Sequence, residues 1–160
     1  MPKHDGLTGA FLKYMKWPNE TDKERVRRML LENDSYRLSG WWEAQYYSHY
    51  AEGFLLVGQD LSELRLKYAH FQRANLTGAR LVDGVFDHVR FNQSRFSRCD
   101  LTNAKFVQCD LSYTVWSGAT LMGCVMQDCR LTGVDLARLK ALGAKVRGKQ
   151  YDGPEDDDQD

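Results

Sequence analysis

The amino-acid sequence predicts a mainly β protein, a β-helix of short segments preceded by a helical cap. The first observation is a period of five: from Leu61 to Leu136 every fifth residue is large and apolar, sixteen times in succession. An α-helix would rotate successive members by about 140°, and a strand would send them to alternate faces, so neither fits. A chain that turns a corner every five residues keeps them on one side. These pentad centres are Leu61, Leu66, Phe71, Leu76, Leu81, Phe86, Phe91, Phe96, Leu101, Phe106, Leu111, Trp116, Leu121, Met126, Leu131 and Leu136.

The second observation is that the residue two positions before each centre is usually small. One large and one small inward residue per pentad would fill a narrow square tube. The small residues are Ala69, Ala74, Ala79, Gly84, Ser94, Cys99, Ala104, Cys109, Thr114, Ala119, Cys124 and Cys129.

The repeat resembles the pentapeptide-repeat family, whose pattern is Ala-(Asp/Asn)-Leu-X-X. The segments that carry the resemblance are 74–78, 99–103 and 109–113, which read ANLTG, CDLTN and CDLSY. The resemblance spans residues 59–138 and implies a right-handed quadrilateral β-helix of about four coils, with four pentads per coil. Residues twenty apart would then stack, which places the rings of Phe96 and Trp116 against each other.

All four cysteines occupy the small inward position. Cys109 and Cys129 would lie on adjacent coils about 4.8 Å apart, a Cα separation that permits a disulfide. In a reducing cytoplasm, buried thiols that act as small apolar side chains are the commoner outcome. The cysteines lack CxxC spacing and no histidine lies inward beside them, which argues against a zinc site.

We expect four segments: an N-terminal helical cap or extension (1–53), the β-helix (54–138), a C-terminal cap (139–150) and an acidic, disordered tail (151–160). Leu7, Phe11 and Met15 recur at helical spacing, and Thr21–Glu24 has the form of a capping box. The open ends of a β-helix need covers. At the C-terminal end, we expect the cover from Leu136, Leu139, Leu142 and Val146.

Composition and motifs favour a non-enzymatic protein of the cytoplasm, without cofactor or metal. No run of about 18 apolar residues could cross a membrane, and the N-terminus lacks the order of a secretory signal. The sequence has no nucleotide-binding glycine loop, nucleophile elbow or metal signature. A filled tube also offers no cavity in which ionisable groups could converge.

Two outward groups of the repeat are candidate binding surfaces. An apolar group at the corner between the first two sides could contact a partner, a second copy or the N-terminal helices. A basic stripe could bind nucleic acid, although opposite charges on neighbouring coils favour a solvated charge ladder. The apolar residues are Val82, Val85, Val107, Met122 and Val125; the basic ones are Arg73, Arg90, Arg95, Arg98, Arg130 and Arg138.

Aromatic residues of the N-terminal segment form a third group, which could be the core of the cap or anchor a partner. They are Trp41, Trp42, Tyr46, Tyr47 and Tyr50.

The predicted function is that of a rigid rod that sterically occupies or blocks a macromolecular partner. A protein partner is favoured over nucleic acid, and a homodimer stays open. The family resemblance implies an alternative, an inhibitor or protector of DNA gyrase or of another DNA-acting complex. Members of that type carry acidic surfaces that mimic duplex DNA. Residues 59–138 hold eight acids and ten bases, which argues against such mimicry. The compact size and the N-terminal helical cap suggest a third possibility, a phage-borne or secreted-effector protein that blocks a host complex.

Overall fold

The structure is a computed structural model that describes Thr21, Glu24, Arg27 and residues 52–149. Thr21 and Glu24 each use a backbone N–H and a side-chain oxygen to bind the other: the Thr21 N–H donates to Glu24 Oε2 at 2.7 Å, and the Glu24 N–H donates to Thr21 Oγ1 at 3.1 Å. This is the predicted capping box. The other N-terminal predictions, including the aromatic group of residues 41–50, and the acidic tail lie outside the described residues.

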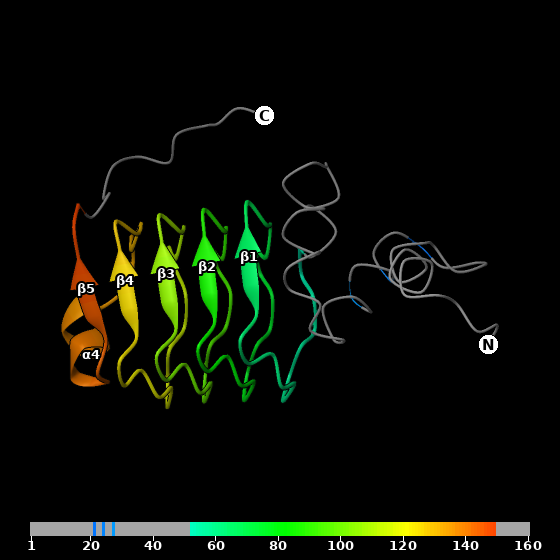
Figure 1. The fold of residues 1–160 in the computed structure, drawn as a ribbon, viewed down its shortest axis with the longest axis horizontal. Helices are drawn as coiled ribbons and strands as arrows, with labels where there is room; N and C mark the ends of the chain where they lie inside the picture. Colours follow the sequence, from blue (N-terminus) through cyan, green and yellow to red (C-terminus); the bar gives the residue numbers. More distant parts are fainter. Residues whose placement is uncertain (1–20, 22–23, 25–26, 28–51, 150–160) are drawn as a thin grey trace, which may run out of the picture.

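One parallel sheet runs along the described part of the chain, with its strands in chain order (Figure 1). Each strand is three residues long and begins twenty residues after the one before. The strands are β1 (Arg65–Lys67), β2 (Val85–Asp87), β3 (Lys105–Val107), β4 (Val125–Gln127) and β5 (Lys145–Arg147). Their register aligns the central residues Leu66, Phe86, Phe106, Met126 and Val146.

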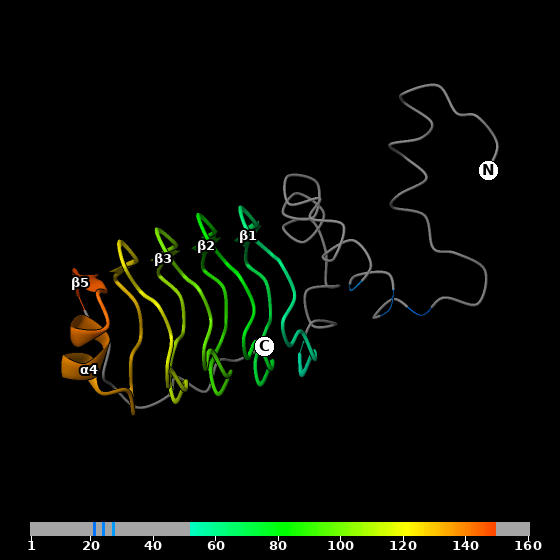
Figure 2. The same cartoon turned by 90° about the horizontal axis from the view of Figure 1, so that it is seen from below.

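The other sides of each coil are held by isolated parallel bridges between residues twenty apart. Since four pentads make one coil, the bridges mark three further sides of a four-sided solenoid, whose stacked coils Figure 2 shows from below. The predicted β-helix of about four coils is therefore confirmed. The bridged columns are Asp60–Arg80–Asp100–Thr120, His70–Arg90–Asp110–Arg130 and Leu55–Asn75–Arg95–Val115.

The core is the predicted filled tube. Fifteen of the sixteen pentad centres are buried, as are all twelve predicted small residues. The rings of Phe96 and Trp116 stack as predicted, with centroids 4.4 Å apart and planes inclined by 6°. Phe91 meets Phe96 edge to face at 5.3 Å. The tube also begins one pentad before the predicted centres, because Leu56 and Phe54 are both buried.

Thr114 has a role in the tube beyond its small size. The Trp116 indole N–H donates to Thr114 Oγ1 at 2.7 Å, and the Thr114 hydroxyl donates to the Leu111 carbonyl at 2.6 Å. A buried indole N–H needs such a partner, so the largest ring in the tube has its polar atom satisfied inside the same pentad.

The corners are formed by residues of positive φ at one pentad position. Among the residues that the structure describes, eleven non-glycine residues and eight glycines have positive φ, and every one of them has a number that ends in 3 or 8. None of the eleven is valine, isoleucine or threonine, because a branched Cβ is strongly disfavoured in this conformation. The chain thus turns at the second residue after each centre.

Asp and Asn before a pentad centre tighten these corners. Asp100 Oδ1 accepts the hydroxyl of Thr102 at 2.6 Å and its backbone N–H at 3.1 Å. Asn75 and Asp60 make the same pair of contacts with the residue two positions later. These Asx turns explain why Asp or Asn so often precedes the centre and Ser or Thr follows it.

At the C-terminal end a short helix replaces part of the last coil. Helix α4 (Leu136–Ala141) begins where the sixteenth centre was expected, so Leu136 is only half-buried. Asp135 occupies the position that makes an Asx turn in earlier pentads, but its Oδ1 accepts the Arg138 N–H at 3.1 Å and caps the helix. Leu139 is buried and Leu142 packs against the core. The chain then returns to the sheet as β5 in unchanged register.

Candidate binding faces of the β-helix

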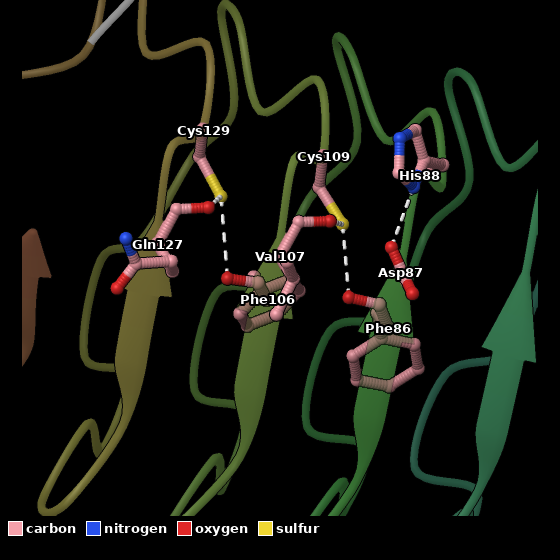
Figure 3. A network of polar contacts seen from close by, with 8 residues as sticks. All are labelled: Phe86, Asp87, His88, Phe106, Val107, Cys109, Gln127 and Cys129. Atoms are coloured by element: carbon pink, nitrogen blue, oxygen red, sulfur yellow. Dashed lines mark hydrogen bonds and ion pairs between the residues drawn. The ribbon is translucent and has the colours of Figure 1, made fainter. Parts of the chain in front are cut away.

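The interior of the tube is filled by buried side chains, and all four cysteines are among them. Cys109 donates its thiol to the Phe86 carbonyl at 3.2 Å, and Cys129 donates to the Phe106 carbonyl at 3.4 Å (Figure 3). Each contact therefore ties one coil to the coil before it. All four cysteines are free and buried, and burial raises the pKa of Cys99 and of Cys124 to about 12. Such thiols are poor nucleophiles.

The predicted apolar group does not form one continuous patch on the sheet. The register places Lys105 directly between Val85 and Val125, and Val107 between Asp87 and Gln127. Val82 and Met122 belong to the preceding side, and Met122 is 62% exposed. The sheet face thus mixes half-buried valines with charged residues.

The predicted basic stripe is divided among several columns. Arg90 and Arg130 lie on either side of Asp110, and Arg95 lies between Asn75 and Val115. Arg73 forms an ion pair with Glu52, and Arg138 belongs to α4. Arg98 covers Gly118 of the next coil, where an added Cβ would lie 3.3 Å from Arg98 Cγ. The structure therefore does not gather the six arginines into one surface.

The strongest concentration of charge lies elsewhere, on the outer side of the sheet. Outward side chains of β1 to β5 comprise five bases, one acid, three valines and one glutamine, and we call these ten residues the basic face. All five bases are exposed. The basic face consists of Arg65, Lys67, Val85, Asp87, Lys105, Val107, Val125, Gln127, Lys145 and Arg147.

Sequence reasoning missed this face although a signal was present. Arg65, Lys105 and Lys145 are forty residues apart and flank pentad centres on the same side of the coil. Lys145 and Arg147, however, follow the segment in which the repeat was recognised. Only the register of β5 shows that they extend the same surface.

A shallow hollow adjoins the basic face at the next corner. It has a volume of about 290 Å³ and includes Tyr68, His88 and Asp110 in its lining. The rings of Tyr68 and His88 lie 5.0 Å apart, and His88 Nδ1 lies 2.5 Å from Asp87 Oδ1 (Figure 3). A second hollow, of about 310 Å³, is lined by Glu24, Arg27 and residues 53–55.

Within the described residues, no group of three or more histidine, cysteine, aspartate or glutamate side chains is arranged to hold a metal ion. In the same part of the chain, no helix has the length and apolar character needed to cross a membrane.

Comparisons with known proteins bear on the family and the fold. Curated proteins include no significant match to the chain. A pentapeptide repeat protein, Rfr23, from the cyanobacterium Cyanothece 51142 aligns at 18% identity with a TM-score of 0.38, over 45% of this chain and 52% of that one. HetL from the cyanobacterium Nostoc sp. strain PCC 7120, described as involved in heterocyst differentiation regulation, aligns at 23% identity and a TM-score of 0.33.

The HetL alignment covers 51% of this chain and 40% of HetL. QnrB1, described as a plasmid-mediated fluoroquinolone resistance protein, aligns at 13% identity and a TM-score of 0.36, over 58% of this chain and 57% of QnrB1. The chain thus spans about half the length of these structures. At such values the likeness transfers no activity or partner.

The family match is more specific, because it rests on the repeat itself. The family described as Pentapeptide repeats (8 copies) matches residues 60–98 and 99–137. These two stretches hold the pentad centres, the Asx turns and the corners of positive φ described above. Residues 60–137 of this chain therefore belong to the pentapeptide-repeat family.

Proposed function

We propose that this protein is a non-enzymatic binding module, a rigid rod that sterically occupies or blocks a protein partner. The observation that supports this proposal is the filled interior: the pentad centres and the small residues beside them are buried, so functional groups can act only from the outer sides. Side chains on a flat outer side do not converge on a reacting atom. A rigid side loses little conformational entropy when a partner binds it.

The size of the basic face limits how a partner can bind. The five strands span four spacings of about 4.8 Å across the sheet, and the three residues of each strand span about 10 Å along it, so the face covers roughly 190 Å². A stable interface buries about 800 Å² on each partner. A partner must therefore also contact a neighbouring side. Val82 and Met122 on the preceding side extend the apolar part of the surface, and the predicted aromatic group of residues 41–50 is a further candidate.

The proposal is tested with a pair of matched variants. Val85→Lys with Val125→Lys adds charge to the sheet side, whereas Val115→Lys adds it on the opposite side of the coil, where Val115 is 43% exposed. Affinity capture with the native chain identifies partners, and each complex is then rebuilt from purified components. We expect the sheet-side variant alone to weaken that complex, with unchanged circular dichroism and thermal unfolding.

Light scattering on the same variants tests a homodimer. A sheet-side variant that binds every rebuilt partner and self-associates like the native chain would refute the sheet side as the interface. Loss of thermal stability in that variant would indicate instead that the valines pack within the chain.

The gyrase-directed alternative makes a separate prediction. A mimic of duplex DNA needs dense negative charge, and the most strongly charged side of the described coils is basic. We therefore expect the purified protein not to inhibit DNA supercoiling by gyrase through duplex mimicry. Stoichiometric inhibition that weakens with added salt would contradict this.

A further inference from the structure

Bases outnumber acids on the basic face by five to one. Its single acid, Asp87, is the register neighbour of Lys67 in β1, and Asp87 Oδ1 lies 2.5 Å from His88 Nδ1. Lys105 and Lys145 are exposed and project outward on either side of the half-buried Val125. A flat surface with charges of one sign attracts a flexible chain of the opposite sign.

In the sequence, an acidic segment follows directly after the sheet. Residues 151–160 contain six acids and no base, and they begin four positions after the last residue of β5. The Lys149 N–H donates to Asp128 Oδ1 at 2.7 Å, so the described chain ends at the corner that follows β4. The acids are Asp152, Glu155, Asp156, Asp157, Asp158 and Asp160.

The extended length of this segment exceeds the width of the face. Residues 150–160 can extend at most about 36 Å at about 3.3 Å per residue. The distance from β5 to β1 is four strand spacings, or about 19 Å. The acidic residues can therefore reach each base of the face without any change in the coils.

We propose that the acidic C-terminal segment, residues 151–160, lies across the basic face of β1 to β5 as its intramolecular occupant. Because the segment is tethered, its effective concentration at the face is in the millimolar range, so even weak ion pairs are populated. An external partner of the basic face must then displace it. The contact within the chain stands whether or not the coils bind a protein partner, and its test needs no partner.

A spin label on the segment tests the proposal in the full-length chain. Asp158→Cys places a thiol in the acidic segment for labelling, whereas the four native thiols are buried in the tube. We expect the nitroxide at position 158 to reduce the amide signals of β1 to β5 selectively. Signals near Val115, on the opposite side, should keep their intensity.

Salt and charge reversal provide the controls. Raising the ionic strength from about 0.01 M to 1 M shortens the Debye length from about 30 Å to about 3 Å and should restore the signals without any substitution in the face. Lys105→Glu with Lys145→Glu should restore them at low salt. The matched pair Arg95→Glu with Arg98→Glu, which reverses two exposed charges on the opposite side, should not.

Three results would overturn the proposal. One is signal loss that spreads evenly over all sides or ignores salt. The second is equal behaviour of the two charge-reversed pairs. The third comes from a mixture of two chains, one isotope-labelled without a nitroxide and the other carrying the nitroxide without isotope label. Loss of signal in the isotope-labelled chain would assign the contact to a second copy.

Discussion

Replacement of Phe96 by alanine removes the ring on which the middle of the tube is packed. Phe96 is fully buried, stacks on Trp116 at 4.4 Å and meets Phe91 edge to face at 5.3 Å. Truncation of a buried phenylalanine costs about 3–5 kcal/mol. Each aromatic pair contributes about 0.5–1.5 kcal/mol beyond its buried area. We therefore expect the loss of stability in Phe96→Ala to lie in the upper half of the range of about 3–5 kcal/mol.

Urea and thermal unfolding of full-length Phe96→Ala measure this loss. With a total stability of about 5–15 kcal/mol, a loss near 4 kcal/mol lowers the melting temperature by at least about 16 °C. Arg95→Ala is the matched control, since Arg95 is the exposed neighbour in the same pentad and its loss should stay within about 0.5 kcal/mol. Equal stability of the two variants would refute the filled-tube interior, as would a soluble, cooperatively unfolding Phe96→Asp protein.

Three further substitutions test local parts of the fold. Thr114→Val leaves the buried Trp116 indole N–H without its acceptor and should destabilise the protein by about 1–3 kcal/mol in urea unfolding. Gly118→Val places a branched side chain at φ +72° and should cost about 1–2 kcal/mol. The Thr102 hydroxyl and backbone N–H hold the pKa of Asp100 below its ordinary value of 3.8, so Thr102→Ala should raise that pKa in a carbon NMR titration.

The sign of the Asp100 effect fixes its pH window. A lowered pKa in the folded state stabilises the protein above pH 3.8, and the contribution disappears as the pH falls through the folded-state pKa. Native and Thr102→Ala proteins should therefore differ in stability at neutral pH and converge in strong acid. Thr132→Ala is the control. The residue two positions before Thr132 is Arg130, whereas the residue two positions before Thr102 is Asp100, so the control removes a threonine that has no carboxylate at that position. A constant difference at all pH values would contradict the assignment.

Controls for the other two substitutions lie close to them in the sequence. Thr120→Val removes an exposed hydroxyl from the same coil as Thr114, and Ser117→Val places the same branched side chain beside Gly118 at a residue without positive φ. Each control should be close to neutral. If Thr120→Val costs as much as Thr114→Val, the indole contact is not the cause.

The interior could be predicted from the sequence because the tube imposes one volume on every pentad. Large residues such as Phe96 and small residues such as Ala104 occupy fixed positions in the pentad. The period, the four sides of the coil and the stacking of Phe96 on Trp116 could therefore be predicted from the sequence. The C-terminal end departs from this because Asp135 can close an Asx turn or cap a helix with the same carboxylate. Leu136 fits a pentad centre and the first residue of α4 equally well.

The corners carried a weaker signal than the interior. Positive φ excludes branched residues but accepts tyrosine, arginine, histidine and acids alike, so the position has no single consensus. Their regularity becomes visible only in the backbone. The first pentad of the tube also departs from the pattern of volumes, because Phe54 fills the usually small position with a large ring at the end of the coils.

Outward residues are free of the constraint that makes the interior predictable, and this is why the sequence did not predict the basic face. A column such as Arg65, Val85, Lys105, Val125 and Lys145 alternates base with valine every twenty residues, a pattern that pentad periodicity does not detect. Helix α4 interrupts the repeat before Lys145, the last residue of this column. Because β5 nevertheless resumes the register, Lys145 and Arg147 join a face that the repeat alone leaves incomplete. The chain therefore extends its basic face beyond its last recognisable pentad, directly beside the segment in which it concentrates its acids.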